Sequence, residues 1–341
     1  MAYTTIDNPG LFFNTVLYTG NGTTDHAITG VGFQPDWTWL KKRSNADDHI
    51  LQDVVRTPTK YLISNSTTAE ATYSEGFKSF DSDGFTLGNA NNTNQNTHTF
   101  AAWNWKAGGS ASSNSDGDVT STVSANQTAG FSIATVSNLN SNSFGHGLGA
   151  EPELIINKRT DDTANWRVYF KGITSGKSLF LNTTAAETTE SSRISSANST
   201  TITVTGSGNG GTGGTGTAVY YSFKSIKGYS KVGTYTGNGN ANGTFVHTGF
   251  RPAWVMYKRS SASGNDWVIV DNKRDPINVC DEELYANLNS ATGDVDLLDF
   301  LSNGFKCRRS HNSQNGSGST YIYLAFAEHP FVTEGTKAAG T

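Results

Sequence analysis

Few residues in this chain have the types and spacing that catalysis or ligand binding requires. Gly176, Lys177 and Ser178 match the end of a phosphate-binding loop, in which backbone N–H groups wrap a phosphate. That loop also needs a glycine five residues before its Gly-Lys-Ser end, and position 171 is a lysine. We therefore predict a hairpin turn here and no nucleotide site.

Two acidic turns, residues 81–84 (DSDG) and 116–118 (DGD), resemble fragments of calcium-binding loops. A complete loop adds a third oxygen ligand and a distal glutamate, and neither segment supplies them. The 7 histidines contain no pair at the short spacings that metal sites use. Asp-Gly turns explain both segments, and we expect neither a metal nor a cofactor.

One acidic–basic pattern occurs twice: Asp53 is followed three residues later by Arg56, and Asp271 by Arg274. Residues i and i+3 of a strand face opposite sides, so a turn must bring each pair together. A salt bridge that fixes the end of a strand is favoured over a catalytic role, because structural ion pairs produce the same pattern. The chain also lacks a G-x-S-x-G nucleophile elbow, and we expect no enzyme.

The composition indicates which elements must position these residues. Of 341 residues, 35% are hydrophobic, 11% aromatic and only 16% charged, and 37 are glycine. This polar, weakly charged, turn-rich profile is typical of an all-β protein. A net charge of −4 without a Lys/Arg run argues against nucleic-acid binding, and no apolar stretch is long enough to span a membrane. The first residues do not form a signal peptide, and 2 cysteines are too few for a disulfide framework.

Self-similarity is the most informative feature of the sequence. Residues 18–22 (YTGNG) and 32–37 (GFQPDW) recur as 235–239 (YTGNG) and 249–254 (GFRPAW), and the two Asp/Arg pairs fall at the same interval. Phe80 with residues 84–85 (GF) likewise recurs as Phe300 with 304–305. Several landmarks in one order, spaced by 217 to 220 residues, indicate a true repeat.

A third, weaker copy lies between these two. Pro152 precedes an apolar run that ends in Lys158, just as Pro252 precedes one that ends in Lys258, and Lys41 follows Pro35 in the first copy. We expect these three lysines to anchor the surface of a sheet. Further matches join Trp166 to Trp267 and residues 179–182 to 284–287, and the copies close on residues 102–103, 222–223 and 325–326.

Short aromatic and β-branched runs bounded by Asn-Gly and Pro predict strands, with one short helix at residues 294–301. The predicted fold is all-β, with three tandem antiparallel β-sandwich repeats of jelly-roll or immunoglobulin-like topology. The repeats are expected to fold separately. The expected boundaries are residues 9–107, a Gly/Ser linker at 108–118, a divergent repeat at 119–227, a third repeat at 228–334 and a tail at 335–341.

The repeat resembles a family of proteins from marine tailed bacteriophages, including phages of cyanobacteria, that occur among tail, fibre and other virion structural genes. The resemblance rests on YTGNG, GF-x-P-x-W, D-x-x-R, F-x-x-x-G-F and residues 321–331 (YIYLAFAEHPF). It covers residues 11–106 and 228–331, whereas the middle copy lacks YTGNG and D-x-x-R. It implies a location in a virion assembled in the host cytoplasm, and no catalytic residue carries over.

We therefore expect a non-enzymatic tail or fibre component that forms homo-oligomers and contacts other virion proteins. The alternatives are a capsid decoration protein, a carbohydrate-binding module and a polysaccharide depolymerase. Host-surface glycan is a further candidate partner, because amides and exposed aromatic rings suit sugars. Loop tips carry binding residues on rigid scaffolds, and the candidate contact residues are Asn91, Asn92, Asn94, Asn96, Asn209, Gly210 and Gly211.

Overall fold

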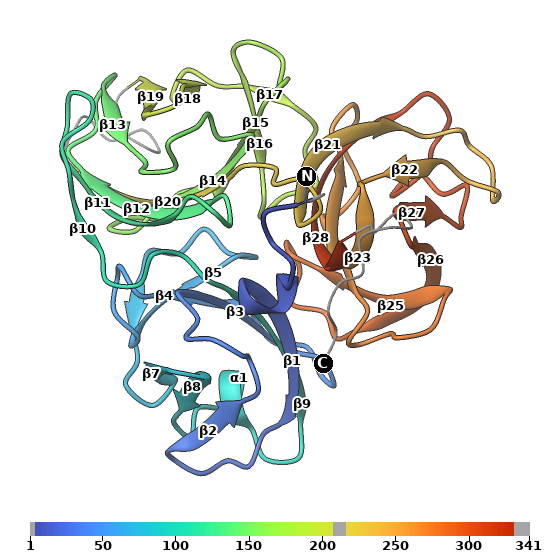
Figure 1. The fold of residues 1–341 in the computed structure, drawn as a ribbon, viewed down its shortest axis with the longest axis horizontal. Helices are drawn as coiled ribbons and strands as arrows, with labels where there is room; N and C mark the ends of the chain where they lie inside the picture. Colours follow the sequence, from blue (N-terminus) through green and yellow to red (C-terminus); the bar gives the residue numbers. More distant parts are fainter. Residues whose placement is uncertain (1–3, 207–215, 331–341) are drawn as a thin grey trace.

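The computed structural model describes residues 4–206 and 216–330. Within these ranges the chain is all-β, and its sheets are antiparallel throughout. The helices there are short: the 3-10 turn η1 (Pro9–Leu11) and α1 (Asn91–Asn94). The strands form three lobes around a common centre, and the chain passes through them in order (Figure 1). We call these lobes the first, second and third units.

The first unit contains a sheet in the order β1-β9-β3-β4-β5-β6 and a smaller sheet in the order β2-β8-β7. Its strands are β1 (Phe13–Thr19), β2 (His26–Thr29), β3 (Trp37–Lys42), β4 (Ile50–Asp53), β5 (Lys60–Ile63), β6 (Ala71–Thr72), β7 (Phe77–Asp81), β8 (Gly84–Leu87) and β9 (Thr99–Trp105). The acidic segment 81–84 forms the tight turn between β7 and β8, which confirms the Asp-Gly turn predicted there.

The second unit contains a sheet in the order β10-β11-β12-β20-β14-β15-β16-β17 and a smaller sheet in the order β13-β19-β18. Its strands are β10 (Ser112–Asn114), β11 (Ser121–Asn126), β12 (Phe131–Ser137), β13 (Ser143–Gly145), β14 (Leu154–Arg159), β15 (Arg167–Phe170), β16 (Lys177–Phe180), β17 (Thr188–Thr189), β18 (Arg193–Ala197), β19 (Thr201–Thr205) and β20 (Thr217–Phe223). Strand β10 lies inside the segment 108–118 that we expected to be a linker, because its backbone pairs with β11.

The third unit forms one continuous sheet in the order β21-β28-β23-β24-β25-β26-β27-β22. Its strands are β21 (Ser230–Thr236), β22 (Phe245–His247), β23 (Phe250–Arg259), β24 (Val268–Asp271), β25 (Cys280–Tyr285), β26 (Gly293–Leu301), β27 (Gly304–Cys307) and β28 (Thr320–Pro330). The helix predicted at residues 294–301 is wrong: this segment is part of β26, which pairs with β25 and β27.

One strand order recurs in all three units. The orders β1-β9-β3-β4-β5, β12-β20-β14-β15-β16 and β21-β28-β23-β24-β25 correspond strand by strand. Register then fixes which residues correspond: Trp37 lies opposite Trp105, and the matching pairs are Leu154 with Phe223 and Trp254 with Phe326. The aromatic residue that matches Phe223 and Phe326 is therefore Trp105 and not Trp103, the residue that we expected from the sequence. Trp103 and Trp105 point to the same side of β9, so the pattern alone does not separate them.

A single hydrophobic core joins the units. It contains Trp37 and Trp105 from the first unit, Tyr221 from the second, and Trp254 and Phe326 from the third. Three smaller apolar clusters lie one in each unit. The surfaces that face the centre are thus buried by neighbouring units, and we call this shared cluster the central core.

Backbone hydrogen bonds close the contacts between units, which we call seams 1–2, 2–3 and 3–1 after the units they join. Each seam has two such bonds at corresponding positions. In seam 1–2 they run from Ala164 N to Thr67 O (2.9 Å) and from Glu70 N to Thr160 O (2.8 Å). In seam 2–3 they run from Gly264 N to Thr184 O (2.9 Å) and from Glu187 N to Ser260 O (3.1 Å). In seam 3–1 they run from Asp47 N to Asn289 O (2.8 Å) and from Thr292 N to Arg43 O (3.0 Å).

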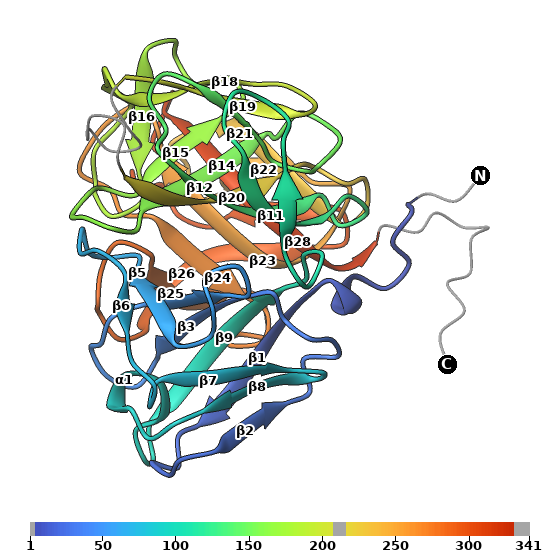
Figure 2. The ribbon, with the colours of Figure 1, turned by 90° about the vertical axis from the view of Figure 1, so that its left-hand side faces the viewer.

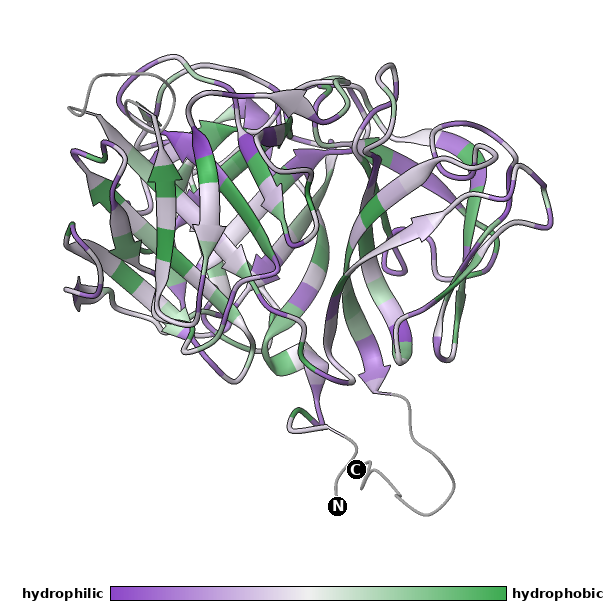
Figure 3. Cartoon of the chain, turned by 90° about the horizontal axis from the view of Figure 1, so that it is seen from above, coloured by the Kyte–Doolittle hydropathy of each residue, from purple (hydrophilic) through white to green (hydrophobic). Residues whose placement is uncertain are grey.

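The beginning and the end of the described chain lie side by side. Turn η1 contacts β28, and both leave the body on one face, as Figures 2 and 3 show. This face is where the third and first units meet.

Candidate functional site

The repeated Asp/Arg pairs lie in turns at the seams, immediately after β4 and β24. Arg56 Nε donates to Asp53 Oδ2 at 2.6 Å, and Arg274 Nε donates to Asp271 Oδ2 at 2.6 Å. The other carboxylate oxygen of each aspartate accepts the backbone N–H of its arginine, which fixes the turn. This confirms the prediction that a turn brings each pair together at the end of a strand.

A neighbouring unit supplies a further donor to each carboxylate. The Tyr221 hydroxyl donates to Asp53 Oδ2 at 2.7 Å, and Trp103 Nε1 donates to Asp271 Oδ2 at 2.9 Å. Burial acts to lower the pKa of Arg56, but Asp53, Tyr221 and Glu70 together outweigh it and the net pKa is raised. Both aspartates have no exposed surface, so solvent and substrates cannot reach them, and the pairs act as structural joints.

The three recurring lysines are not on the sheet surface, and that expectation is wrong. Lys41, Lys158 and Lys258 have no exposed surface, and burial lowers the pKa of each to about 8. Each Nζ donates to the carbonyl of the next residue. Lys41 and Lys258 also donate across a seam, to the Asn289 and Thr184 carbonyls at 3.3 Å.

Asn94, expected at a loop tip, is buried and fully engaged. Its Oδ1 accepts the backbone N–H of Asn21, and its Nδ2 donates to the carbonyls of Thr23 and Gly88 at 2.8 Å. Asn315 holds the matching YTGNG turn of the third unit in the same way. Asn94 is therefore corrected from a glycan contact to a structural residue that fixes a turn.

The other loop candidates lie in different places. Asn96 is exposed beside the same turn, whereas Asn91 and Asn92 begin α1. Asn209, Gly210 and Gly211 lie outside the described residues.

Asn91 and Asn92 line an open groove of about 520 Å³ on the first unit. The groove is also lined by Asp47, Tyr61, Thr72 and Tyr73. Tyr73 is 44% exposed, and Asn92 Oδ1 is buried without a hydrogen-bond partner among the described residues. A ring face, amides and a carboxylate around an open groove can bind a sugar through stacking and hydrogen bonds to its hydroxyls.

Sequence reasoning missed Tyr61 and Tyr73, because they are distant from Asn91 along the chain. The signal that could have found them is departure from the repeat. Register places Glu283 of the third unit at the position of Tyr61. The matching turns place Ser313 at the position of Asn92. The first unit thus differs from the third at Tyr61 and Asn92, whereas Asn91 has Asn312 as its counterpart.

Three other features bear on function in the described part of the chain: metal sites, membrane-spanning helices and reactive thiols. No group of three His, Cys, Asp or Glu side chains there could hold a metal ion. Within residues 4–206 and 216–330, no helix has the length and apolar character needed to cross a membrane. Burial raises the pKa of the Cys280 and Cys307 thiols to about 12, so both are poor nucleophiles.

Comparisons with known proteins give one match. No curated protein and no solved structure matches the chain significantly. A family model, described as a domain of unknown function (DUF7483), matches residues 8–330. The match covers nearly the whole chain, including all three units, and the chain therefore belongs to the DUF7483 family.

Proposed function

We propose that this protein is a non-enzymatic structural component of a tailed-phage virion, in a tail or fibre, built from three β-sandwich repeats. The observation that carries the proposal is the closed set of three seams around the central core. Each seam combines backbone hydrogen bonds with buried aromatic packing, which favours a rigid body over a chain of independently moving domains.

The sandwich repeats are supported by the paired sheets. In the first and second units a sheet facing the central core is accompanied by a three-stranded sheet, β2-β8-β7 or β13-β19-β18. In the third unit β26-β27-β22 takes the same place at the end of one continuous sheet. A separate apolar cluster lies within each unit, as a sandwich interior requires.

The virion role is supported by the resemblance of the repeat motifs to phage structural proteins. A homo-oligomer follows from the same picture, because edge strands such as β6, β10 and β17 are unpaired on one side within the described chain. Such edges can pair with another chain, and closed symmetry is a common way to cover them.

A second role, contact with host-surface glycan, is favoured by the groove that Asn91 and Asn92 line. Its open shape suits a chain of sugars, and Tyr73 offers an exposed ring to stack on one of them. This role is compatible with the structural one, since fibre proteins carry binding sites on a rigid scaffold.

The experiment that tests the structural role is an inventory of purified virions by mass spectrometry, followed by imaging of the labelled protein on particles. We expect the protein on the tail at fixed stoichiometry and an oligomer in solution. Label on the capsid would favour a decoration protein. A monomer that releases reducing sugar from host polysaccharide would favour a depolymerase and contradict the proposal.

The groove is tested separately with host polysaccharide and two matched variants. Tyr73→Ala removes the ring in the groove, and Phe245→Ala removes an equally exposed ring (44%) from the third unit. We expect binding to fall at least tenfold, about 1.4 kcal/mol, in the first variant only. Equal losses, or no binding by the unaltered protein, would rule out the groove without affecting the structural role.

A further inference from the structure

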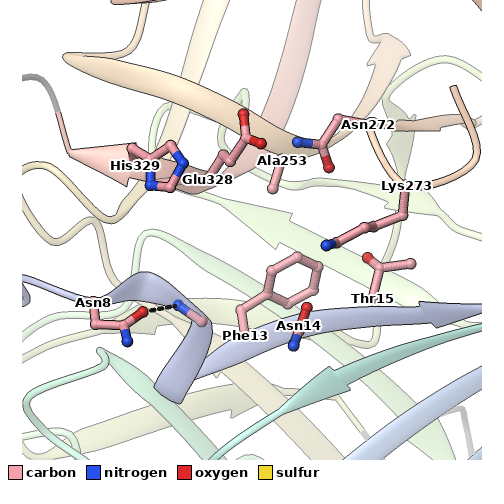
Figure 4. Close-up of a pocket in the computed structure, with 11 residues that line it drawn as sticks. Asn8, Phe13, Asn14, Thr15, Ala253, Asn272, Lys273, Glu328 and His329 are labelled. Atoms are coloured by element: carbon pink, nitrogen blue, oxygen red, sulfur yellow. Dashed lines mark hydrogen bonds between the residues drawn. The ribbon is translucent and has the colours of Figure 1, made fainter. Parts of the chain in front are cut away.

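Seam 3–1 contains a polar cavity of about 300 Å³ near the face where the two ends of the described chain leave the body. It lies between β1 and η1 of the first unit and β23, β28 and the turn after β24 of the third (Figure 4). The residues whose side chains matter here are Phe13, Thr15, Ala253, Asn272, Lys273 and Ala327.

Small residues open this cavity. The Ala253 carbonyl accepts the backbone N–H of Asn272. In the other units the carbonyls of Asp36 and Glu153 accept the corresponding hydrogen bond. The backbone N–H of Ala327 donates to a carbonyl of its own unit. The backbone N–H groups of Lys106 and Lys224 make the corresponding hydrogen bond in the other units. Two alanines thus stand where the other seams have an acidic and a basic side chain, and the space they leave is the cavity.

Polar residues line the space that the alanines leave. Strand register places Ile133 and Val232 at the position of Thr15. The corresponding backbone bonds place Val54 of the first unit and Lys171 of the second at the position of Asn272. Thr15 and Asn272 are only 5% and 7% exposed. Thr15 Oγ1 and Asn272 Oδ1 nevertheless have no hydrogen-bond partner among the described residues.

Buried polar atoms without partners oppose folding. Apolar side chains fit these positions elsewhere, since Val232 stands at the position of Thr15 and Val54 at that of Asn272. A ligand that supplies the missing hydrogen bonds removes this conflict. Asn272 Oδ1 can only accept, so the ligand must present a donor such as a hydroxyl. The Thr15 hydroxyl can pair with a second hydroxyl.

The charge of Lys273 indicates that the ligand also carries an anionic group. Lys273 extends into the cavity above the Phe13 ring (Figure 4), and its ammonium makes no ion pair within the described residues. The acidic residue of the lining, Glu328, is paired with Arg251 at 3.0 Å. The cavity therefore offers an uncompensated positive charge to an anionic group.

We propose that this cavity binds a small polyhydroxylated carboxylate, of the size of one sugar acid. Its carboxylate pairs with Lys273, and its hydroxyls bond to Asn272 Oδ1 and Thr15 Oγ1. The volume lies at the lower end of the range for ligand pockets, which suits a single sugar unit. The site lies at seam 3–1, whereas the groove lies on the first unit, and the site does not depend on the virion role.

Calorimetric titration of the full chain with glucuronate tests the site, with glucose as the neutral counterpart. We expect glucuronate to bind and glucose to bind at least tenfold more weakly. Lys273→Gln should weaken glucuronate binding at least tenfold without changing the melting temperature. Lys231→Gln, a change in β21 away from the cavity lining, is the matched control and should have no effect.

Two further variants keep the test independent of folding. Asn272→Val installs the side chain that the first unit has at this position, and Thr15→Val installs the one that the third unit has. Both should abolish glucuronate binding while the melting temperature stays the same or rises. No glucuronate binding at millimolar concentration, equal binding of glucose, or binding that survives these two variants would overturn the proposal.

Discussion

Two of the three seams hold a buried carboxylate, and seam 2–3, which we call the apolar seam, has apolar side chains at the corresponding positions. At seams 1–2 and 3–1, Asp53 and Asp271 accept hydrogen bonds from Tyr221 and Trp103 of the neighbouring unit. In the second unit the corresponding position is Phe170, and in the third unit Leu324 stands where the donors stand elsewhere. Both residues are buried in the central core.

The difference shows that the carboxylate and its donor are present together or absent together. A buried carboxylate is tolerated only when it is paired and hydrogen-bonded, so losing one partner makes the other a liability. The arginine follows the same rule, because Ile173 occupies the position that Arg56 and Arg274 occupy in the other units. In the apolar seam all three polar residues are therefore replaced together by apolar ones that pack at the same positions.

The largest expected effect comes from breaking a polar seam on one side. Asp271→Ala leaves the Arg274 guanidinium, which has no exposed side-chain surface, without a carboxylate. We expect a loss of about 4 to 5 kcal/mol in the free energy of unfolding, measured with denaturant. Asp53→Ala should cost less, because Arg56 also donates to Glu70 at 2.9 Å. Equal losses would contradict this role of Glu70.

Truncating a side chain in the apolar seam should lower the free energy of unfolding by less. Phe170→Ala removes a buried ring and leaves a cavity, but it strands no charge. We expect a loss of about 3 kcal/mol in the same denaturant experiment. Phe245→Ala, at an exposed ring, is the control and should change the free energy of unfolding by less than about 0.5 kcal/mol. A Phe170→Ala loss above that of Asp271→Ala would reverse the comparison.

The buried lysines belong to all three units and should give a shared pH dependence. Their pKa is about 8 in the folded protein and 10.5 as the ordinary value, so above pH 8 the unfolded chain holds more protons. Stability should therefore rise from pH 8 to 9, by at most about 1.4 kcal/mol per pH unit for each lysine.

Cysteine and tyrosine act in the opposite direction. Burial raises the pKa of Cys280, Cys307 and Tyr221, so these groups lower stability as the pH approaches their ordinary values, 9.0 for cysteine and 10.0 for tyrosine. The two cysteines therefore offset part of the rise near pH 9. Lys258→Met should reduce the rise in urea-denaturation free energy between pH 8 and 9. An unchanged slope would mean that Lys258 does not release its proton on folding.

The smallest effect is expected when one polar seam is converted into the apolar one. The triple variant Asp53→Phe, Arg56→Ile, Tyr221→Leu replaces seam 1–2 side chains with those of seam 2–3. Replacing a buried ion pair with packed apolar groups is often neutral, so we expect a change within about 1 kcal/mol. A loss above about 3 kcal/mol in this variant would show that the seams are not interchangeable.

The sequence predicted the features that depend on local pattern. The all-β class, the Asp-Gly turn at residues 81–84 and the Asp/Arg turns follow from short motifs that act over a few residues. From the sequence, Trp103 was matched to Phe223 and Phe326 in place of Trp105. Side chains alternate between the two faces of a strand, so both tryptophans lie on the same face and the pattern fits either. The segment 294–301 was misread as a helix because its leucines fit either period.

The features that depend on how the units meet were not predicted. Nothing near Lys41 in the chain shows that a carbonyl from Asn289 will cover it. The groove combines Tyr73 with Asn91 only after β6 and α1 are placed on the same unit. Asn94 was misjudged for the same reason, since its partners lie in a turn near Asn21.

The closed set of seams also constrains how the protein is made. Asp47 and Arg43 near the start of the chain bond to Asn289 and Thr292, which are synthesised more than two hundred residues later. At about 5–20 residues per second, translation leaves the side of the first unit that faces the third uncovered for roughly 10 to 50 seconds. Trp105 lacks its ring partners Trp254 and Phe326 during that time, whereas Trp37 is covered earlier by Tyr221 of the second unit. Contacts between residues so far apart in sequence also make the final closure slow, and the last unit to emerge sets the time at which the whole body becomes native.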